Sequence, residues 1–166
     1  MEMTLKQKVE EGVGDHFIQW YNKKMGRRFE FDRLGADPPD LLYRDGEEIL
    51  PVEITTEYYD DKDARFQWTN MRNNRDAPKE WWGIDCDRTL MKNIKNRINQ
   101  KCNGTQDPGT ILVVGITSFA TTDKEFHSML NTICLPADIP FSGIYVGGKF
   151  PSSLDTKGGY FYWQLR

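Results

Sequence analysis

The sequence predicts an α/β or α+β protein in which a mixed β-sheet is flanked by helices, and three observations support this class. Amphipathic stretches at residues 4–25 and 87–102 have helical spacing. An Asp45-Gly46 pair separates two extended stretches, as the turn of a β-hairpin does. Residues 110–117 form a continuous β-branched, apolar run, which is typical of a strand covered on both faces. The predicted order is helix, three strands, helix, strand, then a helix and further strands.

Length and composition indicate a single domain over residues 1–166. With 166 residues the chain can bury a core, and 38% hydrophobic and 28% charged residues are typical of globular proteins. No apolar run approaches the roughly 20 residues needed to cross a bilayer, and no signal peptide is visible, so no membrane partner is expected. The few, widely spaced cysteines fit neither a disulfide framework nor a zinc site, which predicts a cytoplasmic location.

The first helix is predicted to begin at a Thr4 cap and to end at Gly26. Its apolar residues recur at helical spacing and form one stripe: Leu5, Val9, Val13, Phe17 and Trp20. Glu10 and Glu11 lie beside this stripe, and the sequence does not fix which of them faces the sheet. Exposure to solvent is the ordinary alternative for either glutamate. His16 lies near the same stripe and is expected at the boundary of the core.

Three strands are predicted after this helix. Residues 27–34 alternate in part between polar and apolar side chains and form the first strand. Two prolines at 38 and 39 then interrupt regular structure, because proline restricts its own backbone and that of the residue before it. The second strand therefore begins at Asp40. Asp37 is an additional acid nearby, for which a role in the turn is the ordinary explanation.

The predicted hairpin brings two acids together. With the Asp-Gly pair at the centre of the turn, counting outward places Asp40 opposite Pro51. Side chains alternate faces with a period of two, so Glu53 shares the face of Asp40, as do Thr55 and Glu57. Asp40 and Glu53 are then diagonal neighbours, roughly 7–8 Å apart or less, and both carboxylates can reach one divalent ion. The alternative is a solvated hairpin with ordinary surface acids.

Two later stretches carry clustered basic residues. Residues 60–82 have no clear period and interleave aromatic rings with Lys62, Arg65, Arg72, Arg75 and Lys79. Cations that neutralise phosphates beside rings that stack on bases predict a nucleic-acid surface, and an irregular excursion packed on the domain is the alternative. The second helix, capped by Asp87, carries Lys92 and Lys95 on its flanks. These lysines either hold a phosphodiester or are simply solvated.

A family resemblance follows from these residues. Pro39-Asp40, followed about a dozen residues later by Val52-Glu53-Ile54-Thr55, resembles the motif of the PD-(D/E)XK nuclease superfamily. The predicted element order also resembles that family's restriction-endonuclease-like core: an opening helix, a three-strand meander that holds the acids, a crossover helix and a central hydrophobic strand. The resemblance covers residues 9–117, and the chain departs from the pattern at Thr55, where the family has lysine.

The resemblance implies a metal-dependent endonuclease that hydrolyses phosphodiester bonds, with DNA favoured over RNA. Asp40 and Glu53 would bind Mg²⁺ or Mn²⁺, because oxygen ligands suit hard cations. The main-chain carbonyl of Ile54 would be a further ligand, and Glu10 or Glu11 an optional one. A homodimer is a natural assembly for an enzyme that cuts both strands of a duplex.

Thr55 raises the question of catalysis, since it supplies a hydroxyl but no cation. Lys92 or Lys95 would substitute for the missing lysine, or Glu57 would contribute to the site. The expected nucleic-acid-binding residues are Arg65, Arg72, Arg75, Lys79, Lys92 and Lys95. The alternative is a nuclease-fold module that has lost catalysis and binds nucleic acid or a protein partner.

Overall fold

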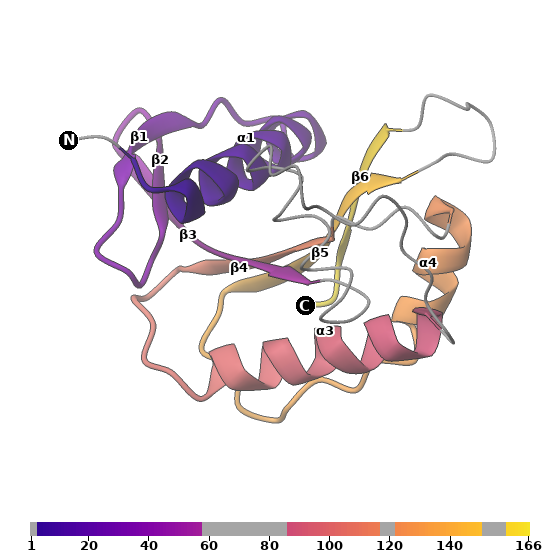
Figure 1. Cartoon of the computed structure of the whole chain (residues 1–166). Helices are drawn as coiled ribbons and strands as arrows, with labels where there is room; N and C mark the ends of the chain where they lie inside the picture. Colours follow the sequence, from indigo (N-terminus) through magenta and orange to yellow (C-terminus); the bar gives the residue numbers. More distant parts are fainter. Residues whose placement is uncertain (1–2, 58–85, 117–121, 151–158) are drawn as a thin grey trace, which may run out of the picture.

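The fold is seen in a computed structural model, which describes residues 3–57, 86–116, 122–150 and 159–166. Within these residues the chain has an α+β fold with a six-stranded mixed sheet and three helices, so the predicted class is confirmed. Helix α1 (Leu5–Met25) covers one face of the sheet, and α3 (Cys86–Cys102) and α4 (Asp123–Leu130) lie on the other (Figure 1). Every helix in these ranges is too short or too polar to span a lipid bilayer.

The strands lie side by side in chain order. They are β1 (Glu30–Leu34), β2 (Leu41–Asp45), β3 (Glu48–Glu57), β4 (Ile111–Ile116), β5 (Gly143–Phe150) and β6 (Gly159–Gln164). Strands β3, β4 and β5 run parallel, whereas the β1–β2, β2–β3 and β5–β6 pairs are antiparallel. The described elements therefore follow one another in the predicted order, and the three parallel strands end at one edge of the sheet.

Strand β4 separates two apolar cores. All 6 of its residues are buried, as the continuous apolar run predicts. Its odd-numbered residues Ile111 and Val113 pack in the core under α1, together with Phe17. Its even-numbered residues, represented by Leu112, pack in the core under α3 and α4. The helix face predicted for α3 supplies part of this second core: Leu90, Met91, Ile94, Ile98 and the partly buried Cys102.

The predicted ends of the helices are largely confirmed. Thr4 forms a capping box at the start of α1, and Gly26 ends the helix in the left-handed region at φ 66°. Thr122 caps α4 in the same way. The prediction that Asp87 caps α3 is wrong, because the backbone of the preceding residue, Cys86, is already helical. His16 is half-buried, as expected at a core boundary.

The hairpin turn lies one residue later than the sequence predicts. Asp45 is the last residue of β2 and pairs with Glu48, so Gly46 takes the first central position of the turn at φ 62°. Glycine suits that position because it adopts a positive φ without steric cost. Asp45 is held in the strand because its Oδ2 accepts a hydrogen bond of 3.1 Å from the backbone N–H of Arg28.

This later turn changes the register but not the faces of the strands. Leu42, and not Asp40, lies opposite Pro51, so that pairing was predicted wrongly. Continuing the observed register by one residue beyond β2 places Asp40 directly opposite Glu53. Because the register moves by an even number of residues, the two acids keep the shared face that the sequence predicts, and they come closer than diagonal neighbours.

Candidate functional site: an acidic cluster between α1 and α3

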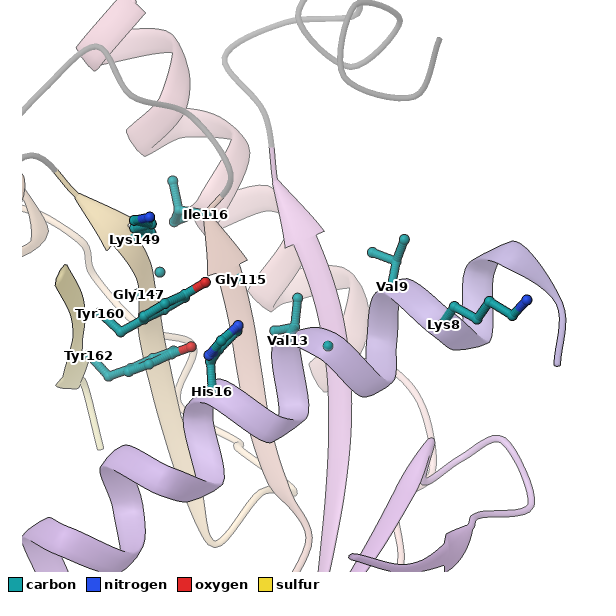
Figure 2. Close-up of a pocket in the computed structure, with 12 residues that line it drawn as sticks. Lys8, Val9, Val13, His16, Gly115, Ile116, Gly147, Lys149, Tyr160 and Tyr162 are labelled. Carbon is teal, nitrogen blue, oxygen red and sulfur yellow. The ribbon is translucent and has the colours of Figure 1, made fainter. Parts of the chain in front are cut away.

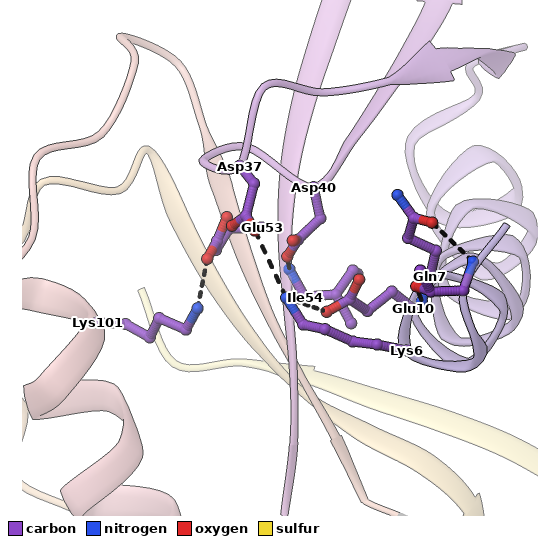
Figure 3. Close-up of polar contacts among 9 residues, drawn as sticks. Lys6, Gln7, Glu10, Asp37, Asp40, Glu53, Ile54 and Lys101 are labelled. Carbon is purple, nitrogen blue, oxygen red and sulfur yellow. Dashed lines mark hydrogen bonds and ion pairs between the residues drawn. The ribbon is translucent and has the colours of Figure 1, made fainter. Parts of the chain in front are cut away.

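Three carboxylates lie close together: two come from the segment that leads into β2, and one comes from the middle of β3. One oxygen each from Asp37, Asp40 and Glu53 lies within 4.8 Å of the others (Figure 3). Asp40 and Glu53 are buried, with exposed fractions of 8% and 2%, whereas Asp37 is exposed. Carboxylate oxygens at this separation can bind one divalent cation, whose oxygen ligands lie about 2.0–2.6 Å from the ion. We call Asp37, Asp40 and Glu53 the acidic cluster.

The loop between β1 and β2 carries Asp37 to the two buried acids. The N–H of Gly35 donates to the Asp40 carbonyl at 2.8 Å, and the N–H of Asp37 donates to the Pro39 carbonyl at 3.0 Å. A Cβ at Gly35 would overlap the Pro39 carbonyl oxygen, so this closed loop requires glycine there. Asp37 has a φ of 52°, a conformation that aspartate adopts more readily than most residues. The turn predicted around Asp37 thus also positions its carboxylate.

Burial perturbs the ionisation of Asp40. It raises the pKa of Asp40 from 3.8 to about 7, although the N–H of Ile54 donates a hydrogen bond of 2.8 Å to Asp40 Oδ2 and favours the charged form. The charges of Glu53 and Glu10 raise this pKa further, whereas Lys101 lowers it. The raised pKa of Asp40 therefore reflects mainly its burial, and the neighbouring glutamates add to it.

Glu53 has one oxygen with a protein partner and one without. Lys101, in the last turn of α3, donates to Oε1 of Glu53 (Figure 3). The other oxygen, Oε2, is buried and has no hydrogen-bond partner among the described residues. A buried carboxylate oxygen is unfavourable unless a donor or a cation reaches it. Glu53 therefore offers an unused ligand atom inside the acidic cluster.

Of the two glutamates left open by the sequence, Glu10 is the one that faces the cluster. Its exposed fraction is 9%, and burial raises its pKa. Glu10, Asp37 and Asp40 line one cavity of about 190 Å³. Lys6 pairs with Glu10 at 3.2 Å and with Asp37 at 3.6 Å. Glu11 lies on another side of α1, where its charge acts on the buried hydroxyl of Tyr43.

The structure brings a different lysine to the acids than the sequence predicts. Lys92 and Lys95 are exposed, and on a helix with 3.6 residues per turn neither shares the face of Lys101. Arg97, one turn before Lys101, donates to Glu57 at 2.6 Å. The sequence holds no local signal for this choice, because the packing of the buried face of α3 sets which flank reaches Glu53.

Thr55 shares the strand face of Glu53, and it is only half-buried. Glu57 is also on this face, but Arg97 engages it at one side of the cluster. Glu57 lies outside the group of converging carboxylates, and its contribution to the site stays a prediction. Thr55 remains a neighbour that brings a hydroxyl and no charge.

The predicted nucleic-acid surface is described only in part. Arg65, Arg72, Arg75 and Lys79, with the aromatic residues between them, lie outside the described residues. Lys92 and Lys95 are described and lie exposed on α3, where solvent or a ligand can reach them. A basic, aromatic surface for nucleic acid therefore stays a prediction.

Comparisons with known proteins leave the family of this chain open. No protein-family model, curated protein or solved structure matches it. The geometry and charge of the acidic cluster are therefore the basis on which a function is inferred.

Proposed function

We propose that the protein is a metal-dependent nuclease of the PD-(D/E)XK type, which hydrolyses phosphodiester bonds of DNA, with RNA as the second candidate substrate. The observation that carries the proposal is the buried Oε2 of Glu53, which has no partner among the described residues and lies in a cluster with Asp40 and Asp37. A restriction-endonuclease-like core is supported by the element order, by the meander that holds the acids and by the buried central strand.

The residues of the acidic cluster fit Mg²⁺ or Mn²⁺. Asp37, Asp40 and Glu53 offer oxygen ligands, which these hard cations prefer, and the family resemblance adds the main-chain carbonyl of Ile54. The raised pKa of Asp40 fits the same role, because a cation can replace the proton that this carboxyl holds near neutral pH. When bound, such a cation lowers the pKa of a water molecule and offsets negative charge on the phosphate.

Lys101 supplies the positive charge that Thr55 lacks. Its ammonium group contacts Glu53 from α3, on the strand face where the family's lysine would project. From this position Lys101 orients the Glu53 carboxylate and can neutralise one oxygen of a phosphate placed beside the cluster. Lys6 contacts Asp37 and Glu10 on the α1 side. The chain therefore has a cation for catalysis in spite of its threonine.

A nuclease-fold module without catalysis is the second candidate, and the same ion pairs favour it. Lys101 occupies one oxygen of Glu53, and Lys6 engages both Asp37 and Glu10. The acids are in this way partly neutralised by the protein itself. Such a module would bind nucleic acid or a protein partner without needing a metal ion.

Cleavage assays on two glutamate variants test the proposal. Glu53→Gln removes a cluster carboxylate, and Glu57→Gln is its matched control, a buried glutamate on the same strand face that contacts Arg97. We expect duplex DNA, single-stranded DNA or RNA to be cleaved with Mg²⁺ or Mn²⁺. Cleavage should fall at least about 100-fold in Glu53→Gln and remain in Glu57→Gln, as for loss of a group that acts on the transition state.

Metal binding is measured separately, by the electron paramagnetic resonance signal of Mn²⁺ titrated with protein. Mn²⁺ bound by the wild type and lost in Glu53→Gln supports the acidic cluster as the metal site. Intact substrates together with no Mn²⁺ binding would overturn the nuclease proposal. Intact substrates with retained, salt-sensitive binding of nucleic acid would select the inactive module instead.

A further inference from the structure

A second cavity lies between α1 and the sheet, and none of its lining residues belongs to the acidic cluster. Its volume is about 280 Å³, near the lower end of the roughly 300–1,000 Å³ typical of ligand pockets. Figure 2 shows it between one side of α1 and the ends of strands β4, β5 and β6. The parallel strands β4 and β5 approach it with their carboxyl-terminal halves, which is where ligands of parallel sheets commonly bind.

Glycines form the sheet side of this cavity. Gly115 of β4 and Gly147 of β5 lie on the sheet face that α1 covers, and Gly148 lines the cavity beside them. A Cβ at Gly147 would overlap the main chain of β6, and one at Gly148 would overlap the main chain of β4. Larger residues therefore do not fit at either position without moving a strand. Gly115 bears directly on the space under α1, because a Cβ there would lie 2.8 Å from the side chain of Val13.

The walls of the cavity are apolar and flat. Val9 and Val13 line it from α1, and the rings of His16 and Tyr160 stack with their centroids 3.8 Å apart and their planes 16° from parallel. The ring of Tyr162 lies beside them (Figure 2). Planar molecules gain most from such surroundings, because aromatic rings favour stacked or edge-on neighbours.

One lysine makes the strand side of the cavity positive. Lys149 on β5 lines the cavity beside Ile116 and Gly147 and is exposed, whereas the side chain of Lys8 points away from the aromatic wall (Figure 2). Lys149 forms no ion pair with a carboxylate of the described residues. An apolar cavity with an unpaired cation at its mouth is complementary to a molecule with an apolar body and an anionic end.

We propose that this cavity binds a small planar aromatic anion, with its ring between α1 and the glycine backbone of β4 and β5 and its carboxylate or phosphate at Lys149. The ring stacks against the His16–Tyr160 wall. A free aromatic carboxylate and a nucleoside monophosphate share this chemistry. The site is independent of the nuclease proposal, because it shares no residue with the acidic cluster.

Three probes test the ligand class by saturation-transfer NMR and by calorimetry: 2-naphthoate, its uncharged counterpart 2-naphthol, and adenosine 5′-monophosphate. We expect saturable binding of 2-naphthoate, at least about tenfold tighter than that of 2-naphthol, which corresponds to about 1.4 kcal/mol for the charged group. Tighter binding of the nucleotide than of 2-naphthoate would identify a nucleotide as the natural form of the anion, and the reverse would identify a carboxylate. Failure of both anions to bind saturably, or equal affinity for 2-naphthoate and 2-naphthol, would overturn the proposal.

Variants of Gly12 test the location of the site. A Cβ at Gly12 has no atom within 4 Å, and the residue lines the cavity, so Gly12→Leu fills the space without disturbing the backbone. Leucine is also a better helix former than glycine, and the variant is expected to fold. Gly12→Leu should weaken 2-naphthoate binding at least about tenfold, since it displaces the ring, whereas the matched Gly12→Ala should change it less than about threefold. Unchanged affinity in Gly12→Leu would place the ligand elsewhere and overturn the assignment.

Substitution of Lys149 tests the charge. The variant Lys149→Gln should weaken 2-naphthoate binding about tenfold or more and leave 2-naphthol binding unchanged, because only the anion depends on the cation at the mouth. The matched control is Lys124→Gln, an exposed lysine on α4 that does not line the cavity. An equal effect of Lys149→Gln on both probes, or the same loss in the control, would contradict the assigned orientation.

Discussion

Asp40→Asn is expected to stabilise the metal-free protein at pH 8. The substitution removes the negative charge and keeps the shape of the side chain, including an oxygen that can accept the hydrogen bond from the Ile54 N–H. The pKa of Asp40 is raised from 3.8 to about 7 by burial, a difference of about 3 units. Each unit is equivalent to about 1.4 kcal/mol, so ionising Asp40 opposes folding by at most about 4 kcal/mol. Partial solvent access reduces the expected gain to about 2 kcal/mol.

The sign of the pH dependence follows from the direction of this shift. The folded protein binds the Asp40 proton more tightly than the unfolded chain, so the wild type loses stability as the pH rises from about 4 to about 7. The loss levels off about one unit above this pKa, near pH 8. Asparagine does not titrate, so the difference between the variant and the wild type should grow over this pH window and vanish below it.

Urea unfolding in EDTA at several pH values from 4 to 8 measures this difference. The wild type, Asp40→Asn and the exposed control Asp138→Asn are compared, and the control should follow the wild type. Mn²⁺ should then stabilise the wild type more at pH 8 than at pH 5, because the cation competes with the proton, and should stabilise Asp40→Asn less. A variant that matches the wild type at pH 8 would refute the view that ionising the buried Asp40 opposes folding.

Two further substitutions test the loop and the lysine of the site. Gly35→Ala should lower the Mn²⁺ affinity about tenfold, measured by calorimetry, because its Cβ overlaps the Pro39 carbonyl and displaces the loop. Gly104→Ala, whose Cβ has ordinary contacts, is the control. Equal Mn²⁺ affinities of the Gly35→Ala variant and the wild type would contradict the role of the loop. Lys101→Gln should slow DNA cleavage about 100-fold while Mn²⁺ affinity is unchanged or higher, and the exposed control Lys124→Gln should alter neither. Cleavage at the wild-type rate in Lys101→Gln would exclude Lys101 from catalysis.

The sequence predicts the elements well because their signals are local. The Thr4 capping box, the glycine that ends α1 and the apolar run of β4 each depend on a few neighbouring residues. The exact position of the hairpin turn does not depend on neighbouring residues alone. It depends on a hydrogen bond from the backbone of Arg28 to Asp45, two residues separated by 17 positions and by a whole strand. The predicted faces of the β3 side chains are nevertheless correct, because the register moved by an even number of residues.

The residues of the site were predictable only where strand alternation fixes them. Glu53 follows from its position in β3, whereas the choice between Glu10 and Glu11 depends on how α1 is rotated against the sheet. The same holds for Lys101 on α3, because the packing of its buried face sets which flank reaches Glu53. Asp37 required the folded loop, in which backbone hydrogen bonds turn an exposed residue back over the site.

The charge balance around the acidic cluster favours one divalent cation over two. Four carboxylates, those of Asp37, Asp40, Glu53 and Glu10, face two ammonium groups, those of Lys6 and Lys101. Fully ionised, this group carries four negative and two positive charges, which is the charge that one divalent ion offsets. A second ion would leave the group positive and would have to displace Lys6 or Lys101 from its carboxylates. The two lysines therefore occupy the place of a second metal, and in the proposed single-ion site Lys101 supplies the positive charge that Thr55 lacks.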